Sequence, residues 1–375
     1  MAASASNTTS YGDYLKLDQL LGLQSGIEGD EARISADELH FIVVHQTFEL
    51  WFKVILRELR LACERLDQAF VPEEEIPQVV HHLDRIHEIF QLGTQQWRVM
   101  ETLATQDFLA FRDKLVPASG FQSFQLRELE IALGLADDVR QGFQGADPLA
   151  HLQKLAERSP AEAQAWSRLE AARARPSLLA AVRGWLYRAP IRGSGPDDPA
   201  DRVIVATFVA DYLAAGQAYQ RDMAERMAAA QGRPLADVLP RFAESDAAAS
   251  RFLMAEDAPP AERERTRRVR AALVFVESYR DLPLLAWPRA LLDRLVALEQ
   301  GMIVWRSRHA RMVERVIGRR IGTGGSSGVD YLDGTATYRV FHELWAVRTL
   351  LLPRERLPRL EGRGQYGFAG QGHAR

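Results

Sequence analysis

Apolar side chains recur every three or four positions over long stretches of the chain, which is the period of an amphipathic α-helix. Runs that alternate apolar and polar positions between turn residues, as half-buried strands do, are nearly absent. No segment repeats with a period of about 20 to 50 residues, so the pattern does not indicate a solenoid. The pattern predicts an all-α protein.

Three apolar seams predict three long helices. The first helix is expected over 35–66, because Ser35 and Glu38 have the spacing of a capping box. Its seam steps by four and three residues alternately and comprises Phe41, His45, Phe48, Phe52, Ile55, Leu59, Ala62 and Leu66. A Pro-containing loop over 71–77 then leads to the second seam, which comprises Val79, Leu83, Ile86, Phe90, Gly93, Trp97 and Met100.

The third helix is predicted to begin after Pro288 and to end at Gly318, a residue suited to a helix C-cap. Its seam comprises Leu291, Leu295, Leu298, Met302, Trp305, His309, Met312 and Val316. At about 1.5 Å per residue, three helices of this length form a bundle roughly 40 Å long. We therefore expect a long-helix bundle with shorter peripheral helices around it.

The other segments are less regular. Residues 186–200 are rich in Gly, Pro and Asp and are expected to form a surface loop. The Ala-, Arg- and Glu-rich segment 226–270 is expected to form short, exposed peripheral helices. Residues 1–10 are predicted to be a disordered N-terminus, 362–375 a flexible tail, and 11–361 a single all-α domain.

Composition narrows the classes of function. The chain has 375 residues, of which 47% are hydrophobic and 26% charged, as in globular proteins. With 47 basic and 50 acidic residues the net charge is -3, which argues against nucleic acid as a partner. The single cysteine, Cys63, excludes an intrachain disulfide, a cysteine-rich zinc site and an iron–sulfur cluster held by four thiolates.

The chain has no window near the roughly 18 uninterrupted apolar residues of a membrane span, and its N-terminus lacks the pattern of a signal peptide. A protein that is not associated with a membrane and lies in a reducing cytoplasm fits these features.

Two histidines, His45 and His309, stand on apolar seams of different long helices. A single seam histidine is more often a satisfied core residue than a ligand, and two such residues weaken that interpretation without removing it. If a haem lay between the helices, one imidazole could bind the iron and the other could face the opposite pocket. The histidines over 81–87 have charged neighbours, and we interpret them as a polar helix face.

Two further patterns carry possible chemistry. Phe108 and Arg112 are one helical turn apart, so an aromatic wall and a guanidinium could hold a small carboxylic or amino acid. An arginine at such a position is more often part of a surface ion pair. The sequence GTGGSSG at 322–328 suits a mobile loop or an anion-binding nest, but it lacks the lysine of a P-loop.

Five motifs together resemble the tryptophan 2,3-dioxygenase family. In family order they are YGDYLKLDQLL at 11–21, DELHFIVVHQTFELWFK at 37–53, SGFQSFQ at 119–125, DLPLLAWP at 281–288 and GTGGSSG at 322–328. The resemblance covers the chain from about Tyr11 to Pro353, and several of these motifs are long and rarely met elsewhere.

The resemblance implies an all-α enzyme that binds haem b and works as a homotetramer, with residues 11–361 as the haem dioxygenase domain. By motif position, His309 resembles the proximal iron ligand and His45 the distal histidine beside the indole nitrogen. The substrate-binding residues implied are the aromatic walls Phe41 and Phe108, the carboxylate partner Arg112, Thr323 near the ammonium, Ser119 near a haem propionate or the polar end of the substrate, and the tyrosines Tyr11 and Tyr14, which enter a neighbouring subunit's pocket.

The implied reaction inserts both atoms of O2 across the indole C2–C3 bond of L-tryptophan and gives N-formylkynurenine, the first step of tryptophan catabolism by the kynurenine route. The insertion removes no net proton, so His45 is expected to orient the indole rather than to act as an obligatory base. Two alternatives stay open: a haem-dependent monooxygenase of tryptophan or of a methylated tryptophan in secondary metabolism, and a haem-binding sensor without turnover. The residue types at the site do not separate these outcomes.

Overall fold

The computed structural model describes residues 9–116, 118, 122–140, 148–322, 328–361 and 363–366, and none of these residues forms a named β-strand. The prediction of an all-α fold is confirmed. The α-helices in chain order are α1 (Tyr11–Leu15), α2 (Leu17–Leu20), α3 (Ala36–Leu66), α4 (Glu75–Met100), α5 (Thr105–Arg112), α6 (Phe124–Leu133), α7 (Pro148–Ala156), α8 (Pro160–Arg173), α9 (Leu178–Arg188), α10 (Asp201–Gln231), α11 (Leu235–Leu253), α12 (Arg263–Ser278), α13 (Ala286–Ile317), α14 (Val329–Thr335) and α15 (His342–Leu350).

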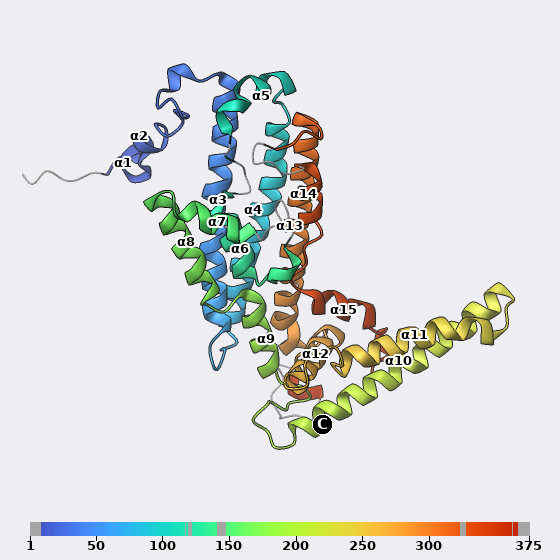
Figure 1. Ribbon diagram of the computed structural model, residues 1–375. Helices are drawn as coiled ribbons and strands as arrows, with labels where there is room; N and C mark the ends of the chain where they lie inside the picture. The colour runs from blue at the N-terminus through green and yellow to red at the C-terminus, as the bar shows by residue number, and fades with distance from the viewer. Residues whose placement is uncertain are drawn as a thin grey trace, which may run out of the picture.

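The three predicted long helices are α3, α4 and α13, and they lie side by side as the axis of the molecule (Figure 1). Helix α4 lies in the middle and packs along both of the others. Two glycines permit this close packing. A methyl group on Gly93 would lie 3.2 Å from the side chains of Phe48 and Trp305, and one on Gly301 would lie 3.2 Å from the ring of His87. Any larger residue at these positions would push the helices apart.

The ends of the long helices follow local chemistry. The Ser35 hydroxyl accepts a hydrogen bond from the backbone N–H of Glu38 at 3.1 Å, which confirms the predicted N-cap. Helix α13 ends at Gly318, whose φ of 62° favours glycine, also as predicted. Helix α4 begins four residues earlier than its seam suggested, because a proline such as Pro77 is tolerated in a first turn, where no intrahelical donor is needed. Pro288 occupies the first turn of α13 for the same reason.

Helices α6, α7 and α8 cover one side of α3. At one end of the bundle, α9, α12 and α15 pack together. Helices α10 and α11 form an arm that extends from that end (Figure 1), held by a small apolar core of Ala224, Ala228 and Val238. Within 226–270, α11 has 19 residues and is mostly exposed, with only Val238 and Leu253 buried, whereas most of α12 is buried.

Buried ion pairs explain why α12 looked exposed in the sequence. The buried Arg268 forms an ion pair with Asp201 at 2.8 Å. The buried Arg270 forms ion pairs with Glu343 at 2.9 Å and with Asp257 at 2.6 Å. Charged residues enter a core when their partners are present. A count of charged residues cannot reveal those partners.

Two segments expected to be at the surface are packed in part. Helix α9 continues to Arg188, and Ile191 and Ser194 in the following segment are buried. Arg268 holds this segment, because it donates hydrogen bonds to the carbonyls of Ala189 at 3.1 Å and of Ser194 at 3.3 Å. The predicted tail begins with a short 3-10 turn, Arg363–Tyr366, and the buried Tyr366 hydroxyl accepts a hydrogen bond from Gly193 at 2.7 Å. Ser10, placed in the disordered N-terminus, caps α1. Residues 1–8 and 367–375 lie outside the described residues.

Within the described residues, α3 is long and apolar enough to meet the length and composition criteria of a membrane-crossing helix. Core helices of soluble proteins meet the same criteria. Helix α3 packs against α4, α6 and α9 and buries two carboxylates, Glu38 and Glu58. Of the apolar window in α3, 28% is buried inside the molecule.

Candidate functional site

His45 on α3 and His309 on α13 face the same region of the bundle. A positive charge on His45 would lie close enough to His309 to lower the pKa of His309. Nδ1 of His45 donates to the carbonyl of Phe41, one turn earlier, at 2.7 Å. Because a carbonyl only accepts, Nδ1 carries the proton and Nε2 of the neutral ring keeps its lone pair. Loss of water around the ring lowers the pKa of His45. His45 is therefore a neutral hydrogen-bond acceptor at physiological pH.

His309 stacks on Trp97 of α4, with ring centroids 4.4 Å apart and planes only 2° from parallel. Trp305 packs beside the same imidazole at 5.7 Å. Among the described residues, none forms a hydrogen bond to the ring nitrogens of His309. Burial, then the charges of His45 and Arg306, lower the pKa of His309 to about 3. The ring is a neutral imidazole with a nitrogen lone pair available to a metal.

An aromatic cluster lies beside His45. The Phe41 ring is 4.1 Å from the His45 ring, 5.9 Å from Phe108 and 5.6 Å from Phe111. Phe108 and Phe111 meet edge to face at 5.3 Å. The structure thus brings together Phe41, Phe108 and His45, which the sequence assigned to one site, and adds Phe111. The spacing of three between Phe108 and Phe111 on one helix was the signal for that residue.

Arg112 ends helix α5, next to this cluster, and donates a hydrogen bond to the carbonyl of Ile321. That carbonyl directly precedes the glycine-rich segment 322–328. Arg112 forms no ion pair with a carboxylate of the described residues, so the surface ion pair considered from the sequence is not its arrangement here. The predicted contacts Ser119 and Thr323 lie outside the described residues.

Tyr11 and Tyr14 are not brought into this region. Both lie on α1, beside rather than within the bundle (Figure 1), and they are 76% and 78% exposed. The segment that follows them is attached to α3, because the amides of Gln24 and Gln46 meet at 2.7 Å, one residue from His45. Lys114 lies two residues after Arg112, and its Nζ forms ion pairs with Glu28 at 2.6 Å and with Glu38 at 2.8 Å.

The histidines at 81–87 form no second site, but the prediction of a polar face fails for His82. This ring is buried, and its Nδ1 donates to Glu58 at 2.6 Å, while Arg85 donates to the other oxygen of Glu58 at 2.6 Å. A buried carboxylate on the neighbouring helix α3 explains the difference. In the described part of the chain no group of three or more His, Cys, Asp and Glu residues is arranged to hold a metal ion.

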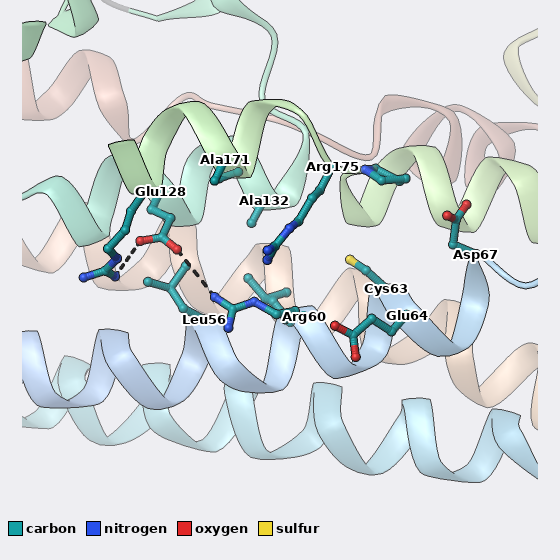
Figure 2. A pocket seen from close by; sticks show the side chains of 13 residues that line it. Leu56, Arg60, Cys63, Glu64, Asp67, Glu128, Ala132, Ala171 and Arg175 are labelled. Atoms are coloured by element: carbon teal, nitrogen blue, oxygen red, sulfur yellow. Dashed lines mark hydrogen bonds and ion pairs between the residues drawn. The ribbon is translucent and has the colours of Figure 1, made fainter. Parts of the chain in front are cut away.

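A cavity of about 640 Å³ lies elsewhere, between α3, α6 and α8, and Figure 2 shows its lining. Its floor is apolar, and its rim carries Arg60, Arg168 and Glu128, with Glu128 at 2.6 Å from Arg168 and 3.7 Å from Arg60. Cys63 also lines it, and burial raises the pKa of this thiol to about 12. None of the predicted site residues lines this cavity.

The residues around His45 and His309 fit a haem. His309 offers a neutral nitrogen without a partner among the described residues, and the buried indole N–H of Trp97 beside it is also without one. Aromatic and apolar side chains surround both histidines, as haem sites require. His309 would bind the iron, and His45 and Phe41 would lie on the substrate's side.

Comparison with known proteins identifies the family. The family model described as tryptophan 2,3-dioxygenase matches residues 1–351. A relative named tryptophan 2,3-dioxygenase 2, from Ralstonia nicotianae, is 48% identical over 96% of this chain and 98% of its own length. A tryptophan 2,3-dioxygenase of Sorangium cellulosum is 46% identical over 98% of this chain and 89% of its own length. A tryptophan 2,3-dioxygenase-like protein of Xanthomonas campestris is 48% identical over its full length and 72% of this chain. This chain belongs to the tryptophan 2,3-dioxygenase family.

Proposed function

We propose that this protein is a haem-dependent dioxygenase that inserts both atoms of O2 across the indole C2–C3 bond of L-tryptophan, giving N-formylkynurenine. The observation that carries the proposal is the joint placement of His45, the phenylalanine cluster and the partner-free ring of His309 in one region of the bundle. The names of the relatives, which match nearly the whole chain, support the substrate.

Substrate recognition divides between two ends of the amino acid. Phe41 and Phe108, with Phe111 behind them, offer a flat apolar slot for an indole ring. Arg112 offers a guanidinium fork for the carboxylate, and its contact with Ile321 holds it beside the glycine-rich segment. Within the same proposal Thr323 contacts the ammonium group and Ser119 lies near the polar end of the substrate or a haem propionate.

The two histidines have different roles. His309 holds the haem iron, and the bound haem supplies the oxygen chemistry. His45 keeps Nδ1 on the carbonyl of Phe41 and so presents the lone pair of Nε2, which accepts a hydrogen bond from the indole N–H. This bond fixes the ring orientation that exposes C2 and C3 to oxygen. The surrounding aromatic rings exclude water from the reacting atoms.

The exposure of Tyr11 and Tyr14 supports a role in another subunit. Their helix carries no buried residue, and exposed apolar side chains continue along the segment at Leu15, Leu20, Leu21, Leu23 and Ile27. Within the proposal, each N-terminal segment completes the pocket of a neighbour in a homotetramer of cytoplasmic subunits. Residues 11–361 act as one haem dioxygenase domain, without nucleic acid or membrane partners.

Oxygen labelling tests the reaction. The ferrous protein is incubated with L-tryptophan under labelled O2, and the mass of the product is measured. We expect two labelled atoms in N-formylkynurenine. One labelled atom in an oxindole or hydroxyindole would contradict dioxygenation and identify a monooxygenase. Absence of product from both tryptophan and methylated tryptophans would identify a haem-binding sensor.

A further inference from the structure

A buried ion pair lies one helical turn before His309. Arg306 is three residues earlier on α13, so its side chain shares a helix face with the imidazole. Its charge is one of the influences that lower the pKa of His309. Arg306 is 3% exposed, and its Nη2 donates to Oε1 of the fully buried Glu130 at 2.6 Å. A charge in this position must be matched inside the protein, because water does not reach it.

Glu130 compensates more than one guanidinium. Its second oxygen, Oε2, accepts from Arg127 at 2.9 Å and lies 3.7 Å from Nε of Arg140. All three arginines are buried, whereas Asp137, the other carboxylate partner of Arg140, is 69% exposed. Glu130 is thus the buried negative charge at the centre of three buried positive charges.

The pair also joins segments that the proposed function assigns to the site. Arg306 donates through Nη1 to the carbonyl of Thr335, the last residue of α14, at 3.0 Å, and its guanidinium lies 4.7 Å from the centre of the Tyr338 ring. Helix α14 follows the glycine-rich segment, and α6, which carries Glu130, follows the segment that holds Ser119. One guanidinium therefore connects three elements that flank the site.

We propose that Glu130 and Arg306 are positioning residues of the haem site, which hold α6, α13 and α14 together and set the net charge beside His309. This inference rests on the proposed function, since it takes His309 as the iron ligand. Neither residue is a catalytic residue, because both act through His309 and through the elements they join.

Electrostatics determines the direction in which these charges shift the reduction potential of the haem. Positive charge near a haem favours the ferrous over the ferric state and raises the reduction potential, and the effect is strong where water is excluded. Neutralising Glu130 removes the buried carboxylate that offsets the three arginines, so the potential rises. Removing the charge of Arg306 leaves less net positive charge in the cluster, so the potential falls.

Paired variants separate this effect from a loss of structure. We expect Glu130→Gln to shift the midpoint potential of the haem-loaded protein to more positive values, and Arg306→Met to shift it to more negative values. Arg306→Lys keeps the charge but loses the fork, so its potential stays close to the original while its thermal unfolding temperature falls. The matched control is Asp201→Asn, which breaks the buried pair with Arg268 at the other end of the bundle. It lowers the unfolding temperature and leaves the potential unchanged.

Shifts of the same sign in Glu130→Gln and Arg306→Met, or potentials equal to that of Asp201→Asn, would overturn the proposal and leave the pair a purely structural one. If Glu130→Gln does not fold, the difference between Arg306→Met and Arg306→Lys decides the question, because only the former loses the charge. The spectrum of His309→Ala tests the ligand assignment separately. Retention of the native haem spectrum in that variant would refute the proposed function, whatever the signs of the potential shifts.

Discussion

The cavity between α3, α6 and α8 and the region between His45 and His309 share helix α3 but differ in how their polar groups are satisfied. In the cavity, Glu128 is engaged by Arg168 and Arg60, and the rim remains in contact with water. Around the histidines the neighbouring side chains are mostly aromatic, and the nitrogens of His309 have no hydrogen-bond partner among the described residues.

In the histidine region the indole N–H of Trp97 is buried without a partner and the His309 nitrogens lack one among the described residues, whereas the charges at the cavity rim are already paired. A buried polar atom without a partner costs free energy, which a ligand can recover on binding. Paired charges at a wet rim have no such deficit.

The largest expected effect is the loss of haem from His309→Ala. The variant removes the nitrogen that we assign to the iron, so the haem content and the Soret band should both fall sharply. The matched control is His82→Ala, which removes another buried histidine, one that is already paired with Glu58. That variant loses stability but keeps its haem. Normal haem occupancy and an unchanged spectrum in His309→Ala would eliminate the assignment.

Acid should destabilise the haem-free protein through His309. Its pKa in the folded state is lowered to about 3, below the unfolded value of 6.5, so the folded state binds fewer protons. The stabilising effect of the neutral ring is complete above pH 6.5 and is lost as the pH falls from there toward 3. Denaturant unfolding across this range should show a steeper decline for the native sequence than for His309→Leu. Parallel pH profiles would mean that the ring is solvated.

Arg112→Lys should weaken binding of tryptophan by roughly 1 to 3 kcal/mol, because lysine keeps the charge but loses the bidentate fork. Tryptamine, which lacks the carboxylate, should bind poorly to the native protein and lose little further in the variant. Binding titrations of both ligands provide the measurement. Equal losses for the two ligands would show that Arg112 acts only through its contact with Ile321.

The smallest effects belong to the cavity. Arg175→Ala removes an exposed side chain from its rim and should change the stability by no more than about 0.5 kcal/mol, with unchanged turnover. Cys63 should react slowly with iodoacetamide at pH 8, because its raised pKa of about 12 leaves little thiolate. Unfolding in guanidinium should restore ordinary reactivity. A turnover defect in Arg175→Ala would show that the cavity contributes to function.

The long helices could be predicted from the sequence because their seams repeat with the helical period and their ends carry local signals such as Ser35 and Gly318. The assignment of Phe41, His45 and Phe108 to one site came from family motifs, and the three rings lie close together in the structure. Long-range ion pairs could not be predicted. The partners of His82, Arg268 and Arg306 lie on other helices, so burial of these polar side chains depends on the folded arrangement.

The attachment of the N-terminal segment to α3 and Lys114 acts as a tether of fixed length. The point of attachment that lies nearest to the tyrosines in the sequence is Gln24, which is held by Gln46. About ten residues separate Tyr14 from this point, and even a fully extended chain of that length spans at most roughly 35 Å. In the proposed homotetramer, Tyr14 can therefore reach a neighbour's pocket only within that radius of its own α3, which limits how far apart the two subunits can lie.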